Sequence, residues 1–122
     1  IMKKTFKLFA GVMLLLAMSA TTVSAQDKDR AGEGAKVVTT EMKTQLSLND
    51  GQYAKVMDIN KTFLQKAAEA EKVTNATDKA KKLKTLTDDR DAKLKSVLNE
   101  TQYKTYQAGR AANAKKLRTY YQ

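Results

Sequence analysis

The sequence predicts an all-α fold of four helices. Proline is absent, and lysine, alanine and leucine are abundant, which is a composition that favours helices. Apolar residues recur every three or four positions, and no useful length alternates with a period of two, so strands are not expected. A short helix-start motif also occurs twice, 50 residues apart. We therefore expect helices at residues 35–47, 50–73, 78–97 and 100–119.

Residues 1–25 have the three-part pattern of a secretory signal peptide. Three lysines form a positive region, an apolar run follows, and Val23-Ser24-Ala25 ends the segment with small or compact residues. The apolar run is shorter than the stretch of about 20 residues that a membrane-spanning helix needs. We expect cleavage before Gln26 and a periplasmic location. An uncleaved N-terminal anchor is the alternative.

The 97 residues after this site are enough for one small domain. Residues 26–34 are polar and contain two glycines, so we expect a flexible leader there and a single helical domain at residues 35–122. Three of the 23 basic residues and none of the 13 acidic ones lie in residues 1–25, which leaves a net charge of +7. Such a surface favours acidic partners, and export argues against nucleic acid.

Cysteine and histidine are both absent, which excludes whole classes of site. Zinc and copper sites use these residues, as do nucleophilic triads and histidine acid–base catalysis. Carboxylates alone could serve a glycosidase, but 97 helical residues leave little room for the cleft that this chemistry needs. We therefore expect no enzymatic activity, no metal site and no cofactor.

The four expected helices each carry an apolar stripe at helical spacing. The first two stripes consist of Ala35, Val38, Met42 and Leu46, and of Val56, Ile59, Phe63, Ala67 and Ala70. The last two consist of Leu83, Leu86, Arg90, Leu94 and Val97, and of Tyr103, Tyr106, Arg110, Ala114, Leu117 and Tyr121. Residues 73–78 interrupt the pattern, and we expect Thr77 or Asp78 to cap the third helix.

The repeated motif predicts two sharp turns between helices. Leu48-Asn49-Asp50-Gly51-Gln52-Tyr53 matches Leu98-Asn99-Glu100-Thr101-Gln102-Tyr103 at four identical positions. In each copy asparagine is a strong N-cap, glutamine three residues later completes a capping box, and leucine can pack on tyrosine as a hydrophobic staple. The motif predicts the end of one helix and the start of the next, and hence two helical hairpins in tandem.

In these two motifs the chain resembles the Spy/CpxP-type periplasmic proteins, whose members carry two Leu-Thr-x-x-Gln motifs. The matching residues are Leu48, Asn49 and Gln52, and Leu98, Asn99 and Gln102, with asparagine in place of threonine in both copies. The resemblance implies a cradle of long helices, paired as an antiparallel homodimer. It also implies ATP-independent binding of unfolded or partly folded proteins, or a role in sensing envelope stress.

The resemblance and the charge lead to three functional hypotheses. The first is a chaperone-like protein of the periplasm, with Arg90, Arg110 and Tyr106 as candidate client-binding residues. A basic face with scattered apolar groups would attract acidic segments and hold them loosely. The alternative for Arg90 and Arg110 is that they have no binding role and lie at helix edges with exposed head groups.

The other two hypotheses use the same helices differently. The chain could be a structural or stress-regulatory protein of the envelope that binds one specific protein partner. Alternatively, the lysine-rich third helix could bind an anionic membrane surface, although aspartates interrupt its charge and tryptophan is absent.

Overall fold

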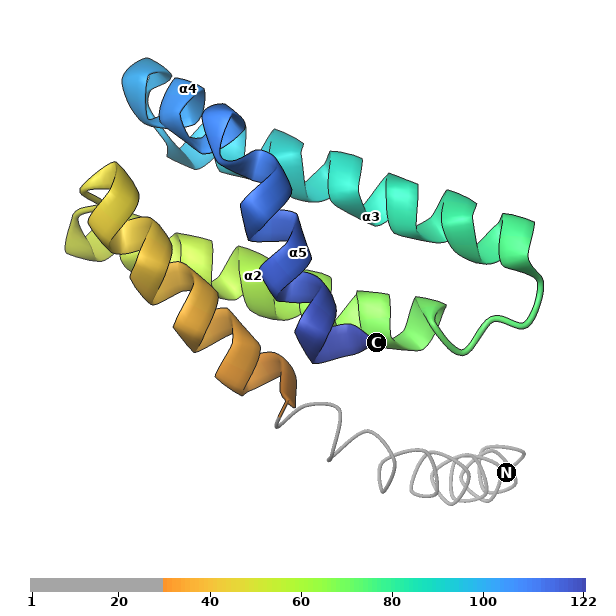
Figure 1. Ribbon diagram of the computed structural model, residues 1–122. Coiled ribbons are helices and arrows are strands. Elements are labelled where there is room, and N and C mark those ends of the chain that lie inside the picture. Colours follow the sequence, from red (N-terminus) through yellow and green to blue (C-terminus); the bar gives the residue numbers. More distant parts are fainter. Residues whose placement is uncertain (1–29) are drawn as a thin grey trace, which may run out of the picture.

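The computed structural model describes residues 30–122, so the signal-peptide expectation for residues 1–25 lies outside the described residues. Within the described range all regular structure is helical, which confirms the all-α prediction. The helices are residues 30–46, α2 (Asp50–Ala70), α3 (Ala76–Val97), α4 (Glu100–Ala108) and α5 (Arg110–Tyr121) (Figure 1). None of the helices in this part of the chain is long and apolar enough to cross a membrane.

The longest helices, α2 and α3, run side by side in opposite directions (Figure 1). The helix at residues 30–46 precedes α2 and runs back along it, and the short α4 follows the far end of α3. α5 then turns back across the molecule and packs on α2. Within residues 30–122, the last helix, α5, thus packs against the first two.

The core lies between the helix at residues 30–46, α2, α5 and the second half of α3. Its largest fully buried apolar side chains are Val38, Met42, Val56, Leu64, Leu94 and Leu117. Most come from the first two helices, whose stripes are apolar as the spacing predicts. α3 contributes only Arg90 and Leu94 as buried residues, both in its second half.

The first helix begins earlier than the sequence suggests. Residues 30–34, expected in a flexible leader, are helical, and Ala31 and Gly34 are buried. The reason is α5: a Cβ atom on Gly34 would lie 2.5 Å from Cγ of Tyr120. Glycine lets the two helices approach this closely, so its presence here serves helix packing and does not mark a linker.

The start of α3 also differs from the prediction. Asn75 is its N-cap, and its side chain accepts a hydrogen bond of 3.0 Å from the backbone N–H of Asp78. Asn75 therefore occupies the position that we assigned to Thr77 or Asp78. Asparagine is among the strongest capping residues, and its side chain reaches the third residue of the helix.

The expected helix at residues 100–119 is two helices. Gly109 separates α4 from α5, so the described residues contain five helices instead of four. Glycine is a poor helix former, and α5 starts without a side-chain cap. The break lets the chain change direction, which places Leu117 in the core over α2.

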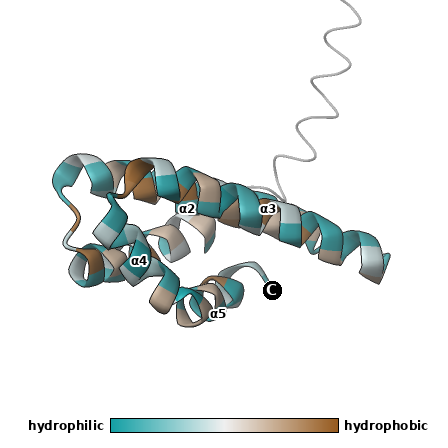
Figure 2. Ribbon diagram, turned by 90° about the horizontal axis from the view of Figure 1, so that it is seen from above, coloured by the Kyte–Doolittle hydropathy of each residue, from teal (hydrophilic) through white to brown (hydrophobic). Residues whose placement is uncertain are grey.

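Within residues 30–122, no helix covers one end of the α2–α3 pair. The loop at residues 71–75 and the adjoining turns extend beyond α5 in two perpendicular views (Figures 1 and 2). The first half of α3 contains no buried residue, and Figure 2 shows it as mostly hydrophilic. We call this part of the described fold the uncovered end.

Candidate functional site

Both copies of the repeated motif form complete capping boxes. The side-chain oxygen of Asn49 accepts a hydrogen bond of 2.8 Å from the backbone N–H of Gln52, whose own side chain accepts one of 3.1 Å from the backbone of Asn49. Asn99 and Gln102 make the same two bonds, at 2.8 and 2.9 Å. The two motifs therefore start α2 and α4 in the same way, as the sequence predicts.

The two motifs also bind each other. Nε2 of Gln52 donates to Oε1 of Gln102 at 2.7 Å, and Nε2 of Gln102 donates to Oε1 of Gln52 at 3.1 Å. Each amide additionally donates to the carbonyl of the last residue of a facing helix, Val97 for Gln52 and Leu46 for Gln102. Every donor and acceptor of both amides is thus used.

The two turns are similar but not identical. The first has one extra residue, Ser47, between the helix end and the motif leucine, and its φ is 55°. The backbone N–H of Leu48 bonds to the carbonyl of Lys43 at 3.2 Å, which is the long-range bond of a Schellman motif. The repeat alone did not indicate this extra residue, because it lies just before the matched positions.

The remaining motif residues pack around this double turn. Leu48 and Leu98 are buried, with exposed fractions of 5% and 6%. Tyr53 is half-buried, and its hydroxyl lies 3.3 Å from Oγ1 of Thr40. The ring of Tyr103 packs on Tyr106 with a centroid distance of 5.8 Å. The four residues that are identical in both motifs therefore stabilise the fold, in each copy, at one end of the described structure.

Arg90 lies at the centre of the helices, with 4% of its surface exposed. Nε donates to Oδ1 of Asn60 at 2.8 Å, while the two terminal nitrogens donate to the hydroxyl of Tyr106 at 3.0 Å and to Oδ1 of Asn113 at 2.6 Å. The guanidinium also lies 5.6 Å from the ring centroids of Phe63 and Tyr106. The planar fork of arginine thus joins α2, α3, α4 and α5.

The carboxylate of Asp91, the residue that follows Arg90 in the sequence, completes this network. The hydroxyl of Tyr106 donates to Oδ1 of Asp91 at 2.7 Å, and Arg110 forms an ion pair with the other oxygen of Asp91. Burial lowers the pKa of the Arg90 guanidinium. Burial also raises the pKa of Tyr106 to about 12, opposed by the charge of Arg90. The hydrogen bond to Asp91 raises the pKa of Arg110.

The structure corrects the assignment of client-binding residues. Arg90 and Tyr106 are each 4% exposed and bound to neighbouring helices, so neither is available to a partner in this conformation. Arg110 is exposed but paired with Asp91. Sequence reasoning missed Asn60 and Asn113, the acceptors that make a buried arginine tolerable. Asn60 could have been noticed, because it lies four residues after Val56.

An open groove lies instead at the uncovered end of the α2–α3 pair. It has a volume of about 370 Å³. From α2 it is lined by Lys66, Glu69 and Ala70, and from α3 by Lys81, Lys82, Thr85 and Leu86. We call this feature the α2–α3 groove. It combines lysine side chains with the apolar surface of an alanine and a leucine.

The charges along this groove are unevenly paired. Lys79 pairs with Glu71 at 3.6 Å, and Lys84 pairs with Asp88 at 2.8 Å. Among the described residues, Lys66, Lys81 and Lys82 have no carboxylate within 4.0 Å. The groove therefore offers unneutralised positive charge at a concave, partly apolar surface.

Comparison with known proteins places the chain in one family. Residues 20–106 match the family model described as a domain of unknown function, DUF4890. The chain belongs to this family. No curated protein and no solved structure matches it significantly.

The DUF4890 range includes both motifs, Arg90 and the α2–α3 groove, and it ends at Tyr106. α5 lies beyond it, although α5 supplies Asn113 to the buried arginine. Within residues 30–122 of this DUF4890 protein, no group of three or more acidic residues could hold a metal ion.

Proposed function

We propose that this DUF4890 protein is an ATP-independent, chaperone-like protein of the periplasm that binds unfolded or partly folded envelope proteins. The observation that carries the proposal is the α2–α3 groove, where three unpaired lysines adjoin apolar surface at the uncovered end of the molecule. Lysine attracts acidic segments over long range, and its methylene stem contacts apolar side chains at short range. Such a surface can hold many sequences loosely.

Three features of the chain support the same proposal. Residues 1–25 have the pattern of an export signal, and the segment after them has a net charge of +7. The resemblance to Spy/CpxP-type proteins in two motifs points to the same class. The motif residues themselves hold the fold together, because Gln52 and Gln102 join the two turns.

A homodimer is part of the proposal and comes from the resemblance. Within residues 30–122, Val37 is the only large hydrophobic residue that is strongly exposed, at 39%. A dimer of this chain would therefore need a largely polar interface. Sedimentation analysis at micromolar concentration tests this point, and a monomer at every concentration would remove the dimer from the proposal.

The decisive test of the function is suppression of aggregation. Light scattering by a heat-denatured acidic enzyme, with and without the exported protein and without ATP, should fall as the protein is added. The effect should weaken with salt, because exposed charges are screened beyond about 8–10 Å at physiological ionic strength.

The second candidate is a structural or stress-regulatory protein with one specific partner. The buried network around Arg90 favours it, since fully hydrogen-bonded polar groups specify one rigid arrangement. Failure to protect any of several unrelated denatured proteins, together with capture of one envelope protein at high affinity, would replace the first proposal by this one.

A further inference from the structure

The α2–α3 groove has a definite chemical asymmetry. Lys81 and Lys82 rim it on α3 and Lys66 rims it on α2, while Ala70 and Leu86 supply apolar surface. Among the described residues of the lining, Glu69 is the single acidic one. The volume of about 370 Å³ is at the small end of the range of about 300–1,000 Å³ that is usual for ligand pockets. It suits a few side chains of an extended segment.

We propose that this groove is the docking site for an extended acidic polypeptide segment that carries an apolar side chain between its carboxylates. The inference rests on the proposed function and names the site and the recognised sequence. The carboxylates pair with Lys66, Lys81 and Lys82, and the apolar side chain packs on Leu86. Glu69 weakens the binding of any carboxylate that lies near it.

Charge complementarity favours this occupant over the two others that the groove could take. A second copy related by a two-fold axis would bring its own basic groove against this one, and like charges would repel. Binding to a membrane surface needs a broad exposed apolar helix face, whereas this site is a groove in which Leu86 is half-buried. An acidic polypeptide fits both the charge and the shape.

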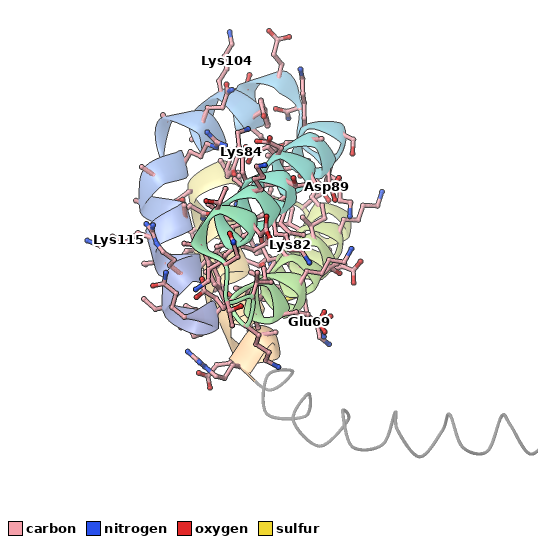
Figure 3. The ribbon with its side chains drawn as sticks, turned by 90° about the vertical axis from the view of Figure 1, so that its right-hand side faces the viewer. Glu69, Lys82, Lys84, Asp89, Lys104 and Lys115 are labelled. Carbon is pink, nitrogen blue, oxygen red and sulfur yellow. The ribbon has the colours of Figure 1, made fainter. Side chains whose placement is uncertain are left out.

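The test compares two triple variants of equal net charge. The groove variant carries Lys66→Glu, Lys81→Glu and Lys82→Glu. The control variant carries Lys36→Glu, Lys55→Glu and Lys115→Glu, at exposed positions outside the groove lining. Figure 3 shows Lys82 and Glu69 at the uncovered end of the α2–α3 pair, whereas Lys115 points away on the far side of α5.

The probe is reduced, carboxymethylated α-lactalbumin, an acidic chain that stays unfolded and has no free thiol. Its binding to the exported protein is followed by fluorescence anisotropy at low ionic strength. The groove variant should bind at least about tenfold more weakly than wild type, because three exposed ion pairs are lost and replaced by repulsion. The control variant should lose less than about threefold, through net charge alone.

A variant that binds the probe more tightly than wild type is also needed, because misfolding cannot explain tighter binding. Glu69→Gln removes the one acidic group of the lining and should tighten binding about two- to threefold, since only an exposed charge is changed. Asp58→Asn makes the same change at an exposed position of α2 outside the groove and should have a smaller effect. Circular dichroism and thermal melting show whether each variant is folded.

The outcomes distinguish a failure of the proposed docking site from a failure of the proposed function. If the groove and control variants lose probe binding equally, the groove is not the docking site, while the proposed function stays intact. Absence of binding by wild type, with aggregation unsuppressed, removes both. Binding to phosphatidylglycerol vesicles but not to the unfolded chain overturns the polypeptide as occupant in favour of a membrane surface.

Discussion

The side-chain amides of Gln52 and Gln102 bond reciprocally across 50 residues of sequence, at 2.7 and 3.1 Å. Each amide oxygen also accepts the backbone N–H of the asparagine that caps its own helix. The two glutamines therefore have two roles: each completes the cap of its own helix, and together they connect the turn before α2 with the turn before α4.

Replacing Gln102 by Glu separates these two roles. A carboxylate can still accept from the backbone of Asn99, so the capping box survives. It has no N–H to donate, so Gln52 and the carbonyl of Leu46 each lose a hydrogen bond. We expect the free energy of unfolding to fall by about 2 kcal/mol in chemical denaturation at pH 7.

The matched control for this change is Gln107→Glu, at an exposed position of α4. It should alter the free energy of unfolding by less than about 0.5 kcal/mol. If the two variants are equally stable, the glutamine pair contributes nothing beyond capping.

Arg90→Lys should lower the free energy of unfolding much more than Arg110→Lys does. Lysine keeps the charge but cannot reach Asn60, Tyr106 and Asn113 together, since its donors radiate from one atom. We expect Arg90→Lys to lower the free energy of unfolding by at least about 2 kcal/mol.

Arg110→Lys should cost less than about 1 kcal/mol, because this side chain is exposed and can still pair with Asp91. Urea denaturation of both variants measures the difference. Similar costs would show that the buried network is less important than its geometry suggests.

Alanine should have opposite effects at two glycines. At Gly109 an added Cβ meets nothing within 4 Å and φ is −103°, so Gly109→Ala should stabilise the protein by about 0.5 kcal/mol through the unfolded chain. At Gly34 the Cβ would lie 2.5 Å from Cγ of Tyr120 and 2.9 Å from Cδ1 of Leu64.

Gly34→Ala should therefore destabilise the protein by about 1–3 kcal/mol and loosen α5 from the first helix. Thermal melting compares the two variants directly. A higher melting temperature for Gly34→Ala than for wild type would mean that α5 does not pack against the first helix in solution.

The raised pKa of Tyr106 predicts a loss of stability in alkali. The unfolded side chain ionises near its ordinary pKa of 10.0, whereas the folded one stays neutral up to about pH 12. The contribution is fully present below pH 10 and is lost as the pH rises through about 12. Its size is on the order of 3 kcal/mol.

Tyr106→Phe isolates this effect from the titration of the other groups. The variant should be less stable at pH 8, because it loses its bonds to Arg90 and Asp91. The difference in free energy of unfolding between the variant and wild type, both measured by urea denaturation, should become smaller between about pH 10 and 12. A constant gap over this range would contradict a raised pKa.

Local features of the fold were predictable from the sequence. The helices of residues 30–46, α2 and α3 follow from apolar spacing, and Asn49 and Asn99 cap the next helices as the motif predicts. Capping and stapling act within about five residues, so a short stretch of sequence contains all the participants. The same locality explains the error at Gly34, where the deciding contact comes from Tyr120.

Local sequence by itself determined that this chain is helical and where two of its helices begin. Only the tertiary structure decided that Gln52 meets Gln102, that Arg90 is buried and that Lys66, Lys81 and Lys82 rim one groove. The physical reason is that hydrogen-bond partners and burial depend on helices that are distant in sequence. An arginine in an apolar stripe is equally consistent with an exposed edge until Asn60 and Asn113 supply its acceptors.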